Sequence, residues 1–296
     1  MYIRNIYDKN PADILQPYIS ILCPTRQRPD RLSKMVESCL NTADNPEQIE
    51  FVLYIDDDDE VPTINNKFAN ISIISGPRIW LSGMHNACAS VAQGEILMWA
   101  ADDICFVTSG WDTEVMNQFK KWNDGLGLVF PNDLSSYKGT LATHAFVKKE
   151  WLRAFGSLVP PYLPDVYTDN WITYLAESIG RITYLEDIII EHLQYRQGKA
   201  NYDETYKARA LNTQVKNYRS TFLRLYRERR NEIVIVCFKY DLKIPFNYMF
   251  ILGWAVAKSN KLSEKTRIKL LSTPNHDFFR LLTTKLFIKI KSLFLN

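Results

Sequence analysis

The sequence predicts an α/β fold, in which a sheet carries helices on both faces, followed by a basic and mainly helical C-terminal segment. Three observations support this prediction. Short apolar runs alternate with helical patterns over the first hundred residues, polar or acidic residues follow each run directly, and Lys and Arg become abundant after residue 215. Alternating strands and helices are typical of a largely parallel sheet that is buried on both faces.

The composition is that of an ordinary globular protein. The 296 residues are 46% hydrophobic and carry 36 Lys and Arg against 33 Asp and Glu, which excludes a disordered or fibrous chain. The five cysteines show neither paired nor metal-ligand spacing, so a reducing compartment is expected. The longest apolar run, 249–257, has nine residues, whereas a membrane span needs about 20. We therefore expect a cytoplasmic protein that does not cross a membrane.

The elements of the first half follow from periodicity and turn signals. Residues 18–23 form an apolar run stopped by Pro24, and the spacing of apolar residues over 30–40 is helical. Gly94 stands where a helix C-terminal glycine is expected. The predicted strands are 18–23, 50–55, 71–74 and 96–101, and the predicted helices are 30–40 and 82–93.

The alternation loosens after Asp103, as expected if the chain completes a second half of the domain. Strands are predicted at 127–131, 140–147 and 182–190, and helices at 148–155 and 171–178, with a proline-marked loop at 158–164.

Candidate site residues cluster at the carboxyl ends of the predicted strands, where α/β sheets bind ligands. Thr25, Asp56, Arg78 and Asp102 all fall at such ends. Arg26 and Arg28 place guanidinium groups there for a nucleotide, and Asp56 is the residue of the acidic run 56–60 suited to accept hydrogen bonds from a base or ribose. The run lacks the glycine and final glutamate of an EF-hand loop, and no G-x-G-x-x-G or Walker motif is present.

Adjacent carboxylates at a strand end are typical ligands of a divalent cation, and Asp102 and Asp103 are such a pair. His192, at the end of another predicted strand, is a further candidate metal ligand. A turn or helix N-cap is the competing interpretation of the Asp pair.

Asp165 and Asp169 follow the proline-marked loop, and a carboxylate beside Trp171 is a candidate general base. Trp171 is either a stacking surface for a sugar ring or a core residue, and a helix N-cap at Thr168 or Asp169 is equally compatible with the pattern.

Six segments, in order, resemble the GT-A fold glycosyltransferases related to the inverting family-two enzymes, including phage and bacterial members. The likeness covers roughly residues 18–210 and rests on CPTRQRP, YIDDDD, SGPRIWLSGMHNACASVAQGEILMWAADDICF, THAFVKKEW, GSLVPPYLPDVYTDNW and IIIEHLQYRQGKA. The implied fold is a Rossmann-like nucleotide-sugar-binding sheet with helices on both faces.

The resemblance also implies roles for individual residues. Asp102 matches the last acidic residue of the family's D-x-D metal motif, and His192 matches the metal-binding histidine that follows later in the chain. Asp169 matches the catalytic base. The implied cofactor is Mn²⁺ or Mg²⁺. Ala100 departs from the pattern, because it stands at the first aspartate of D-x-D. The residues expected around the nucleotide sugar are Thr25, Arg26, Arg28, Asp56, Arg78, Asn86 and Asp103.

The function implied is transfer of a sugar from a nucleotide-diphosphate sugar, with a UDP-sugar as first choice, to an acceptor hydroxyl with inversion. The expected acceptor is a lipid-linked or cell-surface glycan. The alternatives are a DNA glycosyltransferase acting on hydroxymethylated bases, as in phage, and a non-catalytic nucleotide-sugar-binding module, which Ala100 favours and Asp102, Asp169 and His192 oppose.

The charge distribution divides the chain. Residues 216–296 hold 17 Lys and Arg against 5 Asp and Glu, which leaves 19 against 28 in the rest. We therefore expect a catalytic domain at 1–215 and a basic helical appendage at 216–296. Residues 278–295 form a basic amphipathic pattern that suits peripheral contact with an anionic membrane, here the inner face, while phosphate binding and packing on the catalytic domain are the other interpretations.

Overall fold

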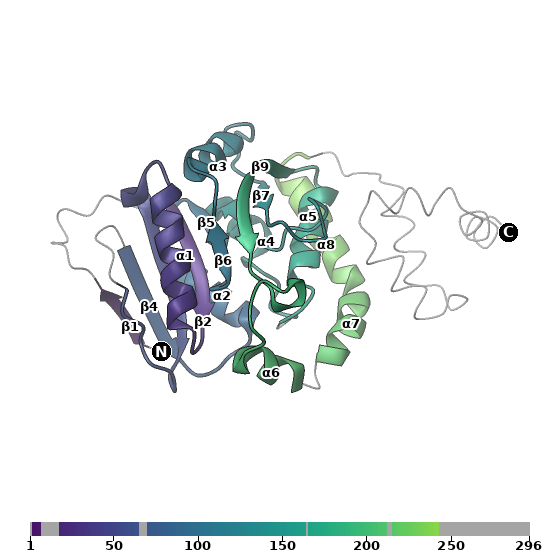
Figure 1. Ribbon diagram of the computed structural model, residues 1–296. Helices are drawn as coiled ribbons and strands as arrows, with labels where there is room; N and C mark the ends of the chain where they lie inside the picture. The colour runs from purple at the N-terminus through teal and green to yellow at the C-terminus, as the bar shows by residue number, and fades with distance from the viewer. Residues whose placement is uncertain (1, 7–17, 65–69, 164, 212–214, 243–296) are drawn as a thin grey trace.

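The computed structural model describes residues 2–6, 18–64, 70–163, 165–211 and 215–242, and these residues form a mixed sheet flanked by helices (Figure 1). The strand order of the nine-stranded sheet is β1-β4-β3-β2-β5-β8-β7-β9-β6. The α/β prediction is confirmed.

Four central strands are parallel and form the half of the sheet that the sequence predicts most clearly. They are β4 (Asn70–Gly76), β3 (Ile49–Asp56), β2 (Ile19–Thr25) and β5 (Ile96–Trp99). Helices α1 (Pro29–Thr42) and α2 (Leu81–Val91) cover opposite faces. Side chains alternate along a strand, so Ile21 packs in the cluster that contains Leu32 of α1, and Leu22 in the cluster that contains Cys88 of α2.

The remaining strands make the sheet mixed rather than parallel. Antiparallel partners flank the parallel strands on both sides: β1 (Tyr2–Ile6) pairs with β4, and β8 (Ala145–Lys148) with β5. Next, β7 (Leu128–Asn132) lies between β8 and β9 (Ile182–His192), parallel to the latter. The prediction of a parallel sheet is therefore correct for the four central strands and for the pair β7 and β9, but not for the sheet as a whole.

Among the described strands and α-helices, β1, β6, α3 and α6 (Glu204–Leu211) have no counterpart in the prediction, and one strand is shorter than predicted. The three-residue strand β6 (Ile104–Phe106) pairs with β9, and α3 (Trp111–Phe119) starts from Gly110, whose φ of 75° is left-handed. The predicted strand 140–147 begins only at Ala145. The helices predicted at 148–155 and 171–178 are α4 (Lys149–Phe155) and α5 (Thr168–Ser178).

Gly94 does not terminate α2 as predicted. The helix ends at Val91 with Ala92 as its C-cap, and Gly94 lies against β2. A Cβ on Gly94 would lie 2.5 Å from Ser20 Oγ and 2.8 Å from Ser20 N. Close approach of two backbones, rather than a left-handed turn, therefore requires glycine here.

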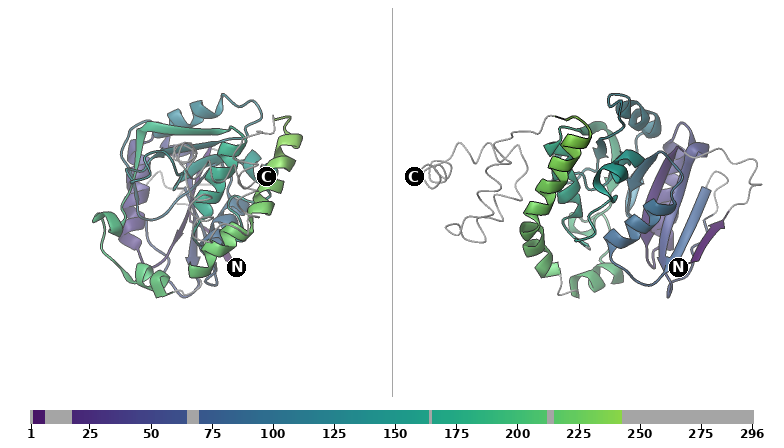
Figure 2. Two further views of the ribbon diagram at one scale, coloured as in Figure 1. Left: turned by 90° about the vertical axis from the view of Figure 1, so that its right-hand side faces the viewer. Right: turned by 180° about the vertical axis from the view of Figure 1, so that it is seen from behind.

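The helices after residue 215 pack on the body of the domain. α7 (Val215–Arg224) and α8 (Tyr226–Lys239) lie on the side remote from β1, with α8 against α4 and α5 (Figure 2). Phe222, Ile233 and Val236 are buried in the same hydrophobic cluster as Leu22. The described part of the basic segment thus shares the core of the predicted catalytic domain.

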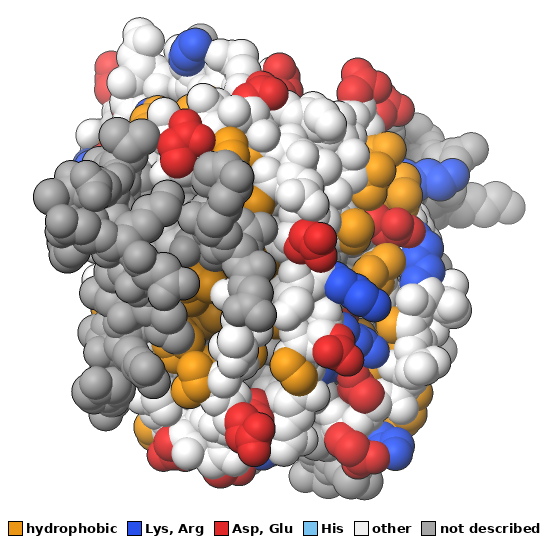
Figure 3. Space-filling view, turned by 60° about the vertical axis from the view of Figure 1, so that its left-hand side comes forward, with side chains coloured by type: hydrophobic (Ala, Val, Ile, Leu, Met, Phe, Trp, Pro, Cys, Tyr) orange, Lys and Arg blue, Asp and Glu red, His pale blue; other side chains and the backbone are white. Residues whose placement is uncertain are grey.

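The predicted membrane-contacting pattern at 278–295 lies outside the described residues. Among the helices that are described, none is long and apolar enough to cross a membrane. On the face shown in Figure 3, the described acidic and basic side chains are interspersed rather than separated by sign.

Candidate active site

The carboxyl edge of the sheet brings together most of the residues singled out in the sequence. Thr25 ends β2, Asp56 ends β3, and Asp102 and Asp103 follow β5. The three carboxylates are almost fully buried, with exposed fractions of 2%, 3% and 6% in chain order. Buried carboxylates need charged or hydrogen-bonding partners, and the loop after β2 supplies many of them.

That loop turns sharply at Gln27, whose φ of 52° is unusual for a residue with a side chain. As a result, the arginines on either side of Gln27 reach different acids. Arg26 donates from Nη1 to Asp56 Oδ2 at 2.9 Å, while Arg28 donates from Nη1 to Asp102 Oδ1 at 2.9 Å. Arg78 is half-exposed, and its Nε lies 3.8 Å from Asp56 Oδ2.

Asp102 and Asp103 are neighbours with different surroundings. Asp102 accepts from Thr25 Oγ1 at 2.8 Å and from Arg28; burial raises the pKa of Asp102 to about 6, against the opposing attraction of Arg28. Asp103 accepts from Tyr206 Oη at 2.5 Å, and its Oδ1 lies 3.4 Å from His192 Nε2. Burial opposes ionisation of Asp103, but the hydrogen bonds from His192 and Tyr206 outweigh it and hold its pKa well below the usual range.

Asp103, rather than Asp102, is therefore the carboxylate in contact with His192. A carboxylate oxygen and an imidazole nitrogen at this separation suit a cation such as Mn²⁺. Across the described part of the chain, no group of three or more His, Cys, Asp or Glu side chains has the arrangement to hold a metal ion. The protein itself thus offers a pair of ligands here, Asp103 and His192.

His144, which the sequence analysis did not single out, packs against this pair. Its ring lies edge-on to that of His192, with centroids 4.6 Å apart, and is 6% exposed. Neither ring nitrogen has a hydrogen-bond partner among the described residues. Burial, and then the nearby His192, lowers the pKa of His144 to about 3. The only signal in the sequence is its place within the THAFVKKEW segment.

Asp203 and Tyr206 are two further site residues that sequence reasoning missed. They lie at the start of α6 (Glu204–Leu211), which follows the 3₁₀ turn Tyr195–Gln197. Asp203 accepts two hydrogen bonds from Arg28, and the Tyr206 ring lies under the Arg28 guanidinium at 4.6 Å. Nothing in the local sequence indicates a contact across 175 residues.

Asn86 lies on α2, but its side chain binds a loop rather than any other predicted site residue. Its Nδ2 donates to Val159 O at 3.0 Å, and its Oδ1 accepts from Leu158 N and Val159 N at 3.0 and 3.2 Å. Leu158 and Val159 are buried, so these bonds satisfy backbone groups that water does not reach.

Asp169 lies in the first turn of α5, two residues after Tyr167, whose backbone is left-handed. Tyr167 has a φ of 68° and is stacked on Phe222 of α7, with ring centroids 5.2 Å apart. Asp169 itself is half-buried and accepts from Asn170 N at 2.9 Å. Left-handed backbone at a non-glycine residue is often found where a functional side chain has to be aimed.

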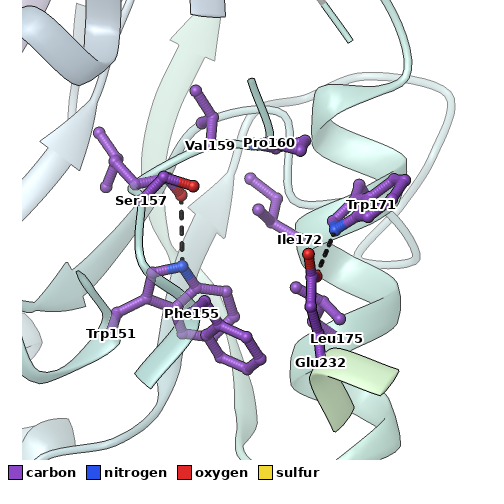
Figure 4. Close-up of a pocket in the computed structure, with 10 residues that line it drawn as sticks. Trp151, Phe155, Ser157, Val159, Pro160, Trp171, Ile172, Leu175 and Glu232 are labelled. Carbon is purple, nitrogen blue, oxygen red and sulfur yellow. Dashed lines mark hydrogen bonds between the residues drawn. The ribbon is translucent and has the colours of Figure 1, made fainter. Parts of the chain in front are cut away.

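Trp171 is 1% exposed, so the core interpretation of this residue is the one that the structure shows. It lines a small pocket between α4, the loop after it, α5 and α8 (Figure 4). Trp171 Nε1 donates to Glu232 Oε2 at 3.1 Å, and burial raises the pKa of Glu232. The guanidinium of Arg229, on α8, lies 4.6 Å from the Trp171 ring centroid. These contacts fix α8 against α5, the helix that carries Asp169.

Comparison with known proteins gives the family of the chain. Residues 20–173 match the profile of the family described as Glycosyl transferase family 2. A curated relative, "O-antigen biosynthesis protein RfbC" from Myxococcus xanthus, is 26% identical over 181 residues, which are 55% of this chain and 14% of that protein. This chain therefore spans only a small part of that relative.

The fold is of the GT-A type, and two solved structures are similar to this chain. S. aureus TarS 1-349 in complex with UDP-GlcNAc has a TM-score of 0.52 at 12% identity, covering 92% of this chain and 78% of that one. The mannosyltransferase PcManGT from Pyrobaculum calidifontis, in complex with GDP-Man and Mn²⁺, has a TM-score of 0.47 at 13% identity, covering 96% and 86%. This chain covers 50% of another TarS structure.

Proposed function

The chain belongs to glycosyl transferase family 2, and from this premise we propose that it transfers a sugar from a UDP-sugar to an acceptor hydroxyl with inversion at the anomeric carbon. The observation that carries the proposal is the group of arginines and buried carboxylates at one sheet edge, where Arg26, Arg28, Asp56, Asp102 and Asp103 meet. Such a site binds a ligand with both hydroxyl groups and negative charge, as a nucleotide sugar has.

The donor is held through both of its polar ends. Asp56 accepts hydrogen bonds from the base or ribose, and Arg26 and Arg78 lie close enough to Asp56 to reach the same nucleotide. Thr25 lies at the same sheet edge, where its hydroxyl donates to Asp102. Arg28 is placed for the diphosphate, since it lies over Asp102 at the end of β5. Asn86 acts from α2 by fixing the loop at Leu158 and Val159.

Asp103 and His192 are the residues that would hold Mn²⁺ or Mg²⁺, because they offer a carboxylate oxygen and an imidazole nitrogen 3.4 Å apart. The bound cation would supply positive charge to the diphosphate. Asp102 remains paired to Arg28 and Thr25, so its contribution is to hold Arg28 over the site.

The reaction is a single displacement. Asp169 removes the proton from the acceptor hydroxyl, the hydroxyl oxygen forms a bond to the anomeric carbon, and the bond from that carbon to the diphosphate oxygen breaks. Arg28 and Arg78 stabilise the negative charge that develops on the departing diphosphate. The configuration inverts because only one displacement takes place.

The acceptor we propose is a lipid-linked or cell-surface glycan. The support is the similarity over 181 residues to a protein named for O-antigen biosynthesis. No observation in the described residues favours DNA as the acceptor over a glycan.

The experiment that tests this function is hydrolysis or transfer with separate UDP-, GDP- and TDP-sugars, followed as release of nucleoside diphosphate with and without EDTA. We expect release from a UDP-sugar that EDTA suppresses. No release from any of the donors, with or without added Mn²⁺, would overturn the proposed function.

A further inference from the structure

Arg28 and Arg31 stand at the N-terminal end of α1 and bind one and the same carboxylate. Arg28 donates from Nε to Asp203 Oδ2 at 2.8 Å and from Nη2 to Asp203 Oδ1 at 2.9 Å. Arg31 Nη2 lies 3.2 Å from Asp203 Oδ2. The two arginines thus form a fork around a single anion that comes from a distant part of the chain.

The geometry of this contact suits a phosphate as well as a carboxylate. Guanidinium groups bind both anions through two parallel hydrogen bonds, and Arg28 uses this arrangement on Asp203. The site is partly shielded from water, since the side chains of Arg28, Arg31 and Asp203 are 10%, 23% and 27% exposed. The amide groups at the start of a helix favour an anion in the same place.

The first turn of α6 contacts Asp103 as well as the two arginines. Asp203 precedes α6 and caps it by accepting from Tyr206 N at 3.1 Å, and the Tyr206 hydroxyl donates to Asp103. Both arginines lie near the face of the Tyr206 ring, at 4.6 and 5.8 Å from its centroid. A displacement of this one turn would therefore uncover the arginine fork and Asp103 together.

We propose that Arg28 and Arg31 form the binding site for the diphosphate of the donor, and that Asp203 fills this site as an internal competitor until the donor displaces it. The inference rests on the proposed function, because it assumes that a nucleotide sugar binds at this sheet edge. It adds Arg31 to the donor site, and it assigns to Asp203 a direct effect on donor affinity. Two anions cannot share the fork, since like charges at such a distance repel one another.

The test is the affinity for UDP of the full chain and of its Asp203→Asn variant, measured by isothermal titration calorimetry. Asparagine keeps the size of the side chain and its ability to cap α6, but it removes the charge that competes for the arginines. We expect UDP to bind about 10-fold more tightly, which corresponds to about 1.4 kcal/mol. GDP and TDP, titrated in the same way, should gain by the same factor, because the diphosphate is common to all three.

Glu204→Gln is the matched control. It makes the same change in charge one residue further along, but the Glu204 side chain is 77% exposed and pairs with Lys207 rather than with the fork. Its affinity for UDP should stay within about twofold of the unmodified chain, because exposed pairs interact weakly.

A second variant changes one of the two arginines instead of Asp203. Arg31→Gln should weaken UDP binding about 10-fold and should reduce the gain produced by Asp203→Asn, since one of the two competing contacts is then gone. This variant keeps the inference testable even if Asp203→Asn does not fold.

Unchanged or weaker UDP binding by Asp203→Asn would overturn the inference, because Asp203 would then position the arginines rather than compete for them. So would unchanged binding by Arg31→Gln. If the unmodified chain releases UDP from a UDP-sugar in either case, the proposed function stands and only the inference fails. Failure of every nucleoside diphosphate to bind both the unmodified chain and Asp203→Asn would contradict the two together.

Discussion

Asn86→Ala separates two roles that can be assigned to one residue. The resemblance in sequence implies that Asn86 lies near the ribose and phosphates of the donor, whereas its side-chain amide makes three hydrogen bonds to the backbone of Leu158 and Val159. The perturbation removes all three bonds at once. It leaves two N–H groups and one carbonyl without partners in a loop whose residues Leu158 and Val159 are 1% and 2% exposed.

A buried backbone group that loses its partner costs about 1 kcal/mol or more, so three groups cost roughly 2–4 kcal/mol, the lower value applying if water enters the space left by the amide. Asn86→Asp is the graded control. Its carboxylate still accepts from both N–H groups but cannot donate to Val159 O, so about a third of the loss is expected.

The assay is urea unfolding of the three proteins, with UDP affinity measured on each under native conditions. We expect the free energy of unfolding to fall while the affinity of the folded protein for UDP changes less than about twofold. If Asn86→Ala kept its stability but bound UDP 10-fold or more weakly, the structural role of Asn86 would be refuted. Asn86 would then be a residue that contacts the donor.

Further predictions concern stability, pH and metal binding. Gly94→Ala should lower the free energy of unfolding by about 3 kcal/mol, because the new Cβ would lie 2.8 Å from the backbone nitrogen of Ser20. Gly156→Ala places its Cβ where no atom lies within 4 Å, so it should cost only about 1 kcal/mol, for the left-handed φ. Equal losses for the two variants in urea unfolding would contradict this prediction. Burial lowers the pKa of His85 from its ordinary 6.5 to about 4. The folded protein should therefore lose roughly 3 kcal/mol of stability relative to His85→Gln as the pH falls from 6.5 to 4, and none above pH 6.5. Parallel curves of stability against pH for the two proteins over that range would exclude the effect. His192→Ala should weaken Mn²⁺ binding in the presence of UDP at least 10-fold, as followed by electron paramagnetic resonance, and undiminished binding would remove His192 from the metal site.

Local patterns in the sequence predict the parts of this fold that depend on local chemistry. The strands β2, β3 and β4 and the helix α1 were predictable because continuous apolar runs and helical spacing report burial on both faces of a sheet. The carboxyl ends of those strands then located Thr25 and Asp56 at one edge. α3 was missed although Trp111, Val115 and Phe119 recur at helical spacing, so a signal for it was present.

Long-range contacts account for what the sequence did not predict. The strand β6 has three residues, too few for a periodic pattern, and is defined by its pairing with β9. The contacts of Asp203 with Arg28 and of His144 with His192 join segments whose own sequences carry no sign of the partner. Gly94 shows the opposite case, in which a local rule suggested a helix end but a tertiary contact determines the residue.

The most direct test of the central claim is the release of nucleoside diphosphate from UDP-, GDP- and TDP-sugars by the unmodified chain and by Asp169→Asn. Transfer to an acceptor hydroxyl requires a base, and Asp169 is the proposed one. We predict that Asp169→Asn lowers turnover about 10²- to 10⁴-fold while the affinity for UDP stays within about twofold, because general bases contribute on that scale to the chemical step. Near-normal turnover by Asp169→Asn would remove Asp169 from the mechanism, and the absence of nucleotide release by the unmodified chain with every donor would contradict the account as a whole.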